Sequence, residues 1–216
     1  MSKPTGACSL AALLLMAAMI FAPPVRAQNA ATAAEAANGL VAAVAKNDIQ
    51  AAAGYVAASD RDRFVSLMQA STQLANARDG FRKTVVAKLP ANPTAAALVT
   101  RTAPPHIDHI AIVAERTVSR DEVDLDVKSF GGDGRSSPTP STWRAVRENG
   151  QWRIHLPPCA SAQAAAPLMK RYQDLIAATN GVTTAVESGR ITNFGDAHIA
   201  LFKAELGALG AQGEQQ

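Results

Sequence analysis

Cysteine, net charge and long apolar runs are the features that this sequence has least of. Two cysteines in 216 residues are too few for the disulfide framework that stabilises many small exported domains. The formal net charge is only +3, which gives no electrostatic case for nucleic-acid binding. The longest apolar run, Leu10–Ala22, has 13 residues, whereas a helix needs about 20 to cross a bilayer.

The first 27 residues have the layout of a secretory signal peptide. Lys3 supplies a positive start, the apolar run follows, and a proline pair ends it. Val25-Arg26-Ala27 then places small residues at the −3 and −1 positions of a cleavage site. We therefore expect cleavage after Ala27 and a periplasmic or secreted protein without a stable membrane span. The alternative is an uncleaved N-terminal anchor.

Cleavage would change both the charge and the cysteine count. The signal segment holds two of the 21 Lys and Arg residues and none of the 18 acidic ones, which leaves 19 basic against 18 acidic residues. Such a near-neutral chain has no electrostatic reason to bind nucleic acid or anionic lipid. Cys159 alone remains, and a single thiol cannot form an internal disulfide. A hydrophobic core must therefore hold the fold together.

Helical periodicity marks the first third of the remaining chain. Residues 28–46 are alanine-rich, and a second helix is expected over residues 49–58, after an Asn-Asp cap. A third helix is expected over residues 59–88, where Ser59-Asp60-Arg61-Asp62 resembles a capping box. Leu89-Pro90 ends it.

The last part of the chain returns to helix over residues 160–210. Asn180-Gly181 is the expected C-terminal cap of one helix, and Thr192 or Asn193 is the expected N-terminal cap of the last one. Residues 211–216 are expected to be a frayed tail.

Between these helices, residues of about 106–157 alternate with the period of strands. One strand is expected over residues 106–118 and another over residues 121–128. A hairpin follows over residues 141–156, with its turn at Asn149-Gly150. Helices, then strands, then helices predict an α+β fold with a curved, four-stranded antiparallel sheet, in one domain over residues 28–210.

The Asn-Gly turn also sets the register of the hairpin, because a two-residue loop pairs Glu148 with Gln151. One face of the sheet is then expected to be apolar and to carry both tryptophans, which we expect to be largely buried. That face holds Val123, Leu125, Val127, Trp143, Ala145, Arg147, Trp152, Ile154 and Leu156. Asp124 and Asp126 alternate to the other face, where Arg144 and Arg153 are the expected partners.

Two short segments resemble the nuclear transport factor 2-like superfamily. Ala45-Lys46-Asn47-Asp48 stands where that superfamily often has an Ala-x-Gly-Asp step, and Arg147–Ile154 is similar to its late hairpin ending in Gly-x-Trp-Lys-Ile. The resemblance covers roughly residues 30–157 and implies helices packed on a curved sheet, forming a cone with an apolar pocket. The chain departs from that pattern in its helices after residue 160 and in its long helix 59–88.

The resemblance implies where a ligand or a catalytic group would lie. Isomerases and cyclases of that superfamily use an Asp or His inside the cone, where apolar surroundings tune its pKa. The apolar face here offers no carboxylate, so the candidate bases are His109 and Asp108, at the mouth of the cone. The candidate pocket residues are Trp143, Trp152, Arg147, Leu125 and Ile154.

Metal and phosphate sites have weaker support. In His106-Ile107-Asp108-His109, two ligands share one strand face, and a metal site needs three or four. Gly131-Gly132-Asp133-Gly134 leads into a strand, whereas a phosphate loop leads into a helix. We therefore expect neither a metal nor a cofactor.

Three functions stay open. The first is an exported, non-catalytic domain that binds a small apolar ligand or a partner protein. The second is an isomerase-like or cyclase-like enzyme that uses His109 or Asp108. The third is an envelope-associated helical adaptor, which would expose an apolar stripe formed by Ile199, Phe202 and Leu206.

Overall fold

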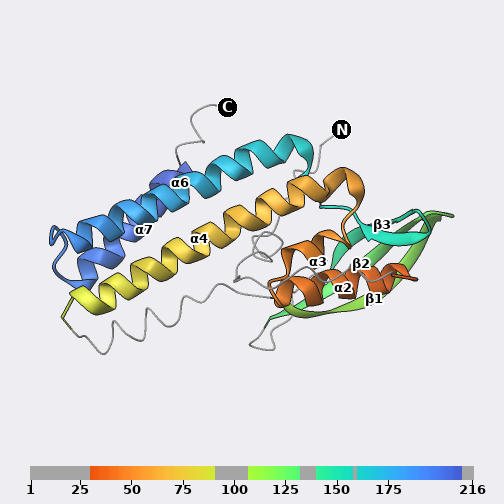
Figure 1. Cartoon of the computed structure of the whole chain (residues 1–216), viewed down its shortest axis with the longest axis horizontal. Coiled ribbons are helices and arrows are strands. Elements are labelled where there is room, and N and C mark those ends of the chain that lie inside the picture. Colours follow the sequence, from red (N-terminus) through yellow and green to blue (C-terminus); the bar gives the residue numbers. More distant parts are fainter. Residues whose placement is uncertain (1–29, 91–106, 132–139, 158–159, 211–216) are drawn as a thin grey trace, which may run out of the picture. The chain divides into compact units, whose positions relative to one another are not determined.

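The computed structural model describes residues 30–90, 107–131, 140–157 and 160–210 (Figure 1). Helices precede and follow a curved antiparallel sheet of four strands, so the predicted α+β fold is confirmed. The predicted signal peptide, His106, Cys159 and the tail after residue 210 lie outside the described residues. Contacts group the chain into two compact units: residues 1–68 with 104–165, and residues 69–103 with 166–216. The single domain expected over residues 28–210 stays a prediction.

In the first unit, helix α2 (Ala33–Ala45) begins at a capping box. The Thr32 hydroxyl accepts from the backbone N–H of Glu35, and the Glu35 carboxylate accepts from the backbone N–H of Thr32. This reciprocal pair fixes the start of the helix at Ala33, later than the alanine-rich composition predicts. Helix α3 (Ile49–Ala53) begins at the expected cap, Asp48.

The sheet consists of β1 (Ile107–Ser119), β2 (Glu122–Gly131), β3 (Ser141–Glu148) and β4 (Gln151–Ile154) in that spatial order. Helix α2 lies against one face of this sheet (Figure 1). Small and branched side chains of the helices fill the space above the central strands. The buried core of this unit consists of Ala30, Ala33, Ala36, Ala37, Leu40, Val41, Ala43, Ala52, Ala53, Val56, Phe64, Met68, Ile110, Val123, Leu125, Val127, Ala145 and Ile154.

The predicted hairpin register is confirmed. Arg147 pairs with Trp152, and Glu148 pairs with Gln151. Asn149 and Gly150 have φ angles of 51° and 80°, as a two-residue type I′ turn requires. Both tryptophans lie on the core face, as expected, but the expectation of large burial is wrong: both are half-buried and pack at the margin of the core.

The pairing of β1 with β2 shows on which face of the sheet each residue of β1 lies. The sequence does not decide this. Ile112 pairs with Val127 and Ile110 pairs with Ser129, so the two isoleucines face the core. His109 pairs with Phe130 and lies on the opposite face. Three register irregularities interrupt this strand, and they are typical of a long edge strand.

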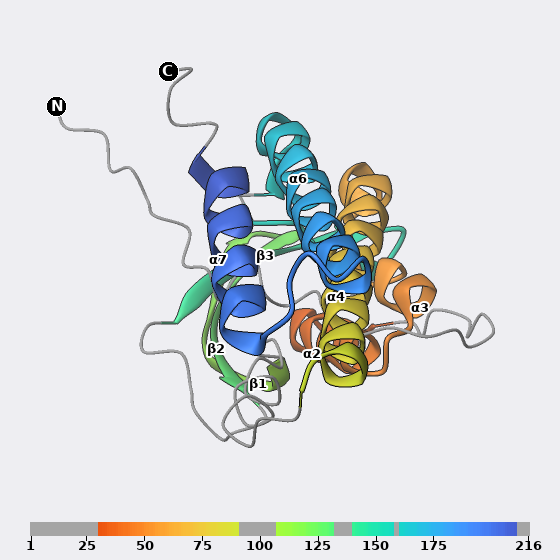
Figure 2. The same cartoon turned by 90° about the vertical axis from the view of Figure 1, so that its left-hand side faces the viewer.

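The second unit contains α4 (Arg61–Lys88) from residue 69 onward, α6 (Ala162–Glu187) from residue 166 onward, and α7 (Phe194–Gly210). Figure 2 shows these three helices alongside one another. Their buried contact consists of Phe81, Val85, Leu89, Val182, Val186 and Ala197. Asn193 caps α7, as expected, by accepting from the N–H of Asp196 at 2.9 Å.

The predicted end of a helix at Asn180-Gly181 is wrong, because α6 continues to Glu187. Val182 and Val186 extend the apolar stripe of α6 into the core of the second unit. Their burial outweighs the cost of about 1 kcal/mol for a glycine within a helix. Within the described ranges, no helix is both long enough and apolar enough to cross a membrane.

Candidate functional site

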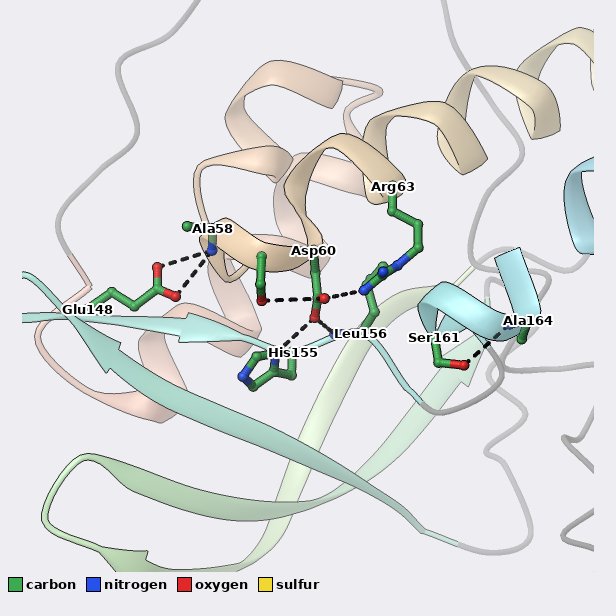
Figure 3. A network of polar contacts seen from close by, with 9 residues as sticks. Ala58, Asp60, Arg63, Glu148, His155, Leu156, Ser161 and Ala164 are labelled. Atoms are coloured by element: carbon green, nitrogen blue, oxygen red, sulfur yellow. Dashed lines mark hydrogen bonds and ion pairs between the residues drawn. The ribbon is translucent and has the colours of Figure 1, made fainter. Parts of the chain in front are cut away.

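A network of polar contacts in the first unit centres on the carboxylate of Asp60 (Figure 3). Asp60 is only 7% exposed. Its Oδ2 atom accepts from Nδ1 of His155 at 2.8 Å and from the backbone N–H of Leu156 at 3.0 Å. Its Oδ1 atom accepts from the guanidinium of Arg63 and from the hydroxyl of Ser59. Both carboxylate oxygens are therefore fully engaged.

Backbone pairing beside β4 brings these residues together. The N–H of Ile154 donates to the carbonyl of Tyr55 at 2.8 Å, and the N–H of Ala57 donates to the carbonyl of Ile154 at 3.0 Å. Val56 thereby forms a parallel bridge with Ile154. The segment that follows, the 3-10 turn η2 (Ala58–Asp60), comes to the end of β4. This pairing ends the second helix earlier than the sequence predicts.

The surroundings of Asp60 keep it ionised. Burial by itself raises the pKa of this carboxyl, but hydrogen bonds from His155 and Leu156 and the charge of Arg63 outweigh burial and lower the pKa below its ordinary value. An ionised carboxylate can only accept hydrogen bonds, so the proton of the shared bond belongs to Nδ1 of His155. A neutral His155 then carries its lone pair on Nε2, and its side chain is 34% exposed.

An aspartate that fixes the Nδ1 proton of a histidine also occurs in catalytic sites, where the histidine acts as a base. Among the described residues, however, Asp60 is the one side chain that bonds the His155 ring. The remaining bonds of Asp60 join the start of α4 to the end of β4. We call this network of Asp60 with Ser59, Arg63, His155 and Leu156 the clasp, because it joins these two segments.

The candidate base that the sequence offers is not part of this network. His109 is exposed, on the face of the sheet opposite to the core, and its ring stacks on Phe130 with centroids 4.6 Å apart. Its position therefore does not match a base that faces into a cone. The side chain of Asp108 lies outside the described part of the structure.

The candidate pocket residues share one face of the sheet but differ in burial. Leu125 and Ile154 are buried in the core, at 0% and 3% exposure. Trp143 and Trp152 pack at its margin, and Arg147 is exposed. Their role as the lining of a ligand pocket stays a prediction.

The outer face of the sheet carries the expected pairs of acidic and basic side chains, except that Arg116 takes the place expected for Arg153. Arg144 pairs with Asp124 at 2.8 Å, as expected, whereas Asp126 pairs with Arg116 of β1 at 2.8 Å. Arg153 does not join these pairs, because its guanidinium turns to acceptors on its own strand. In the part of the chain that the structure describes, no group of three or more His, Cys, Asp or Glu side chains could hold a metal ion.

A second candidate site is the outer face of α7. Ile199, Phe202 and Leu206 follow one another at helical spacing and are 52%, 60% and 50% exposed. The opposite face of the same helix is also apolar. It packs into the core of the second unit through Ala197, Ala200, Leu201 and Ala204. Helix α7 is therefore apolar on both sides, and one side faces solvent.

Comparison with known proteins adds no relative: no protein-family model, curated protein or solved structure matches this chain. The likeness to the nuclear transport factor 2-like superfamily thus rests on the two short segments and on the helix-and-sheet layout.

Proposed function

We propose that this chain is an exported, non-catalytic protein that binds another envelope protein through the outer face of α7. The observation that supports this proposal is the stripe of Ile199, Phe202 and Leu206, each at least half exposed. Soluble proteins expose single apolar residues commonly, but an aligned group on one helix face is typical of a binding surface. The stripe is the feature that the adaptor hypothesis requires.

The other two hypotheses have less support from the geometry. An enzyme of the isomerase or cyclase kind needs a base in a site that excludes water, whereas His109 is exposed. A small apolar ligand would need free space beside the pocket residues, yet Leu125 and Ile154 are already packed within the core. Docking of a partner protein on α7 requires no rearrangement of either core.

The stripe can supply a useful share of a binding free energy. Full burial of a large apolar side chain contributes about 1.5–3 kcal/mol, and these three side chains are about half exposed. Together they could contribute a few kcal/mol, and Phe202, the most exposed of them, would contribute most.

We test the surface with a photo-crosslinking amino acid at position 202 in the protein exported by its own cells. A cross-linked partner is then identified and purified, and its affinity is measured by calorimetry. Phe202→Asp should weaken binding by about a hundredfold, since it puts a charge into an apolar contact. The matched control is Val86→Asp, which changes an exposed apolar residue of α4. Equal affinities of the two variants, or no cross-link at position 202, would refute the proposal.

Export has its own test. We expect N-terminal sequencing of the mature protein to begin at Gln28, because the Val25-x-Ala27 site follows a short apolar run. Recovery of the chain with Met1 still attached would contradict cleavage, whatever the outcome of the binding experiment.

A further inference from the structure

Arg153 is a buried cation without a carboxylate partner among the described residues. It is only 9% exposed. Its Nη1 atom donates to the carbonyl of Trp152 at 3.0 Å, and its Nη2 atom donates to the side-chain oxygen of Gln151. Both acceptors are neutral. Buried arginines are normally paired with an anion, because taking an isolated charge out of water is costly.

Arg61, a second cation without a carboxylate partner in the part of the chain that the structure describes, lies at the same seam between β4 and the segment beside it. Arg61 donates from Nε to the carbonyl of Ala53 at 3.1 Å and from Nη2 to the carbonyl of Val56 at 3.5 Å. Val56 is the residue that bridges to Ile154, next to Arg153. Burial, and then repulsion from Arg61, lower the pKa of Arg153.

The described carboxylates near Arg61 and Arg153 do not balance the positive charges of these two arginines. Among the described residues, Glu148 is the carboxylate whose charge raises the pKa of Arg153, and the phenol of Tyr55 also raises it. Both oxygens of Glu148 accept from the backbone N–H of Ala58, at 3.2 and 3.1 Å. The charge of Asp60 is already engaged by Arg63 and His155.

We propose that the seam between Arg61 and Arg153 binds a small oxyanion of the phosphate or carboxylate class. A guanidinium group offers parallel N–H donors that match two oxygens of such an anion. An anion between the two groups would replace their repulsion with two attractive contacts. Arg61 is exposed, so the anion can reach it from solvent. This site is separate from α7 and does not depend on the proposed docking surface.

The probe is inorganic phosphate, titrated into the full mature chain at constant ionic strength with chloride as the balancing anion. We expect binding in the millimolar range, measured by calorimetry and as a phosphate-dependent rise in Tm. Arg61→Gln should weaken it at least about tenfold, a loss of about 1.4 kcal/mol. The control is Arg116→Gln, whose arginine is already paired with Asp126. It should bind phosphate as the unchanged chain does.

Arg153→Gln should weaken phosphate binding as well. If that variant does not fold, Arg61→Gln and Arg116→Gln decide the outcome, because Arg61 lies at the surface. Absence of any phosphate-specific effect, or equal affinity of Arg61→Gln and Arg116→Gln, would overturn the proposal. A parallel titration with acetate separates the two oxyanion classes. The anion that binds more tightly and raises Tm more identifies the class, and its binding supports the site if Arg61→Gln weakens it.

Discussion

Replacement of Asp60 by alanine should destabilise the first unit by roughly 3 kcal/mol, at the low end of the range for breaking a buried ion pair. The change leaves the N–H of Leu156, the ring of His155 and the guanidinium of Arg63 without their acceptor. The low end applies because the side chains of His155 and Arg63 keep 34% and 21% of their surface exposed, and water can replace part of the lost contact. Denaturant unfolding, followed by tryptophan fluorescence, measures this loss.

The matched control is Asp62→Ala, which removes a carboxylate two residues later, in the first turn of α4. Asp62 is exposed, so its loss should cost only a few tenths of a kcal/mol through the helix dipole. A double variant adds a further test, since His155→Ala should cost little once Asp60 is absent. Similar losses for Asp60→Ala and Asp62→Ala would show that the clasp is not needed for stability.

The contribution of the clasp to stability should also depend on pH in the acid range. The folded-state pKa of Asp60 is lowered, so its stabilisation is fully present above the unfolded-state pKa of about 4. It is lost as the pH falls from there through the lowered, folded-state pKa. Asp60→Asn should therefore show a shallower acid loss than the unchanged chain. Asp79 and Asp124, whose pKa values are also lowered, are present in both proteins and do not affect the difference.

The clasp could not be predicted from sequence because its two halves are 95 residues apart. Locally, Ser59-Asp60-Arg61-Asp62 has the pattern of a helix start, and that interpretation is correct as far as it goes. Nothing near Asp60 indicates that the segment before it pairs with β4, since Tyr55-Val56-Ala57 is compatible with helix. The position of Asp60 depends on that long-range pairing.

The hairpin, in contrast, was predictable because its pairing depends on residues that are close together in the sequence. Its turn is two residues long, Asn149 and Gly150 favour positive φ, and every pair on both strands follows from that one turn. Burial was less predictable than register. An alternating pattern says which face of a strand points inward, but how far the covering helices reach decides whether a residue such as Trp143 is buried or marginal.

Leu125→Ala should cost about 2–5 kcal/mol, the range for removing a large buried side chain from a packed core. Leu125 is 0% exposed and lies on β2, an inner strand, on the face that α2 covers. Its cross-strand neighbours are Glu115 and Trp143, and a close-packed interior relaxes only partly around the space that alanine leaves.

The matched control for this change is Val113→Ala, in the neighbouring strand β1. Val113 is 54% exposed and lies at one of the register irregularities of β1, so trimming it should cost no more than about 0.5 kcal/mol. The two variants are compared by urea unfolding, with the slope of the transition checked for constancy. A cost below about 1 kcal/mol for Leu125→Ala, or one equal to that of Val113→Ala, would mean that the face beneath α2 is not the tightly packed core on which the sheet depends. It would also restore the case for a ligand space at this face, because a loosely packed site tolerates the loss of a side chain.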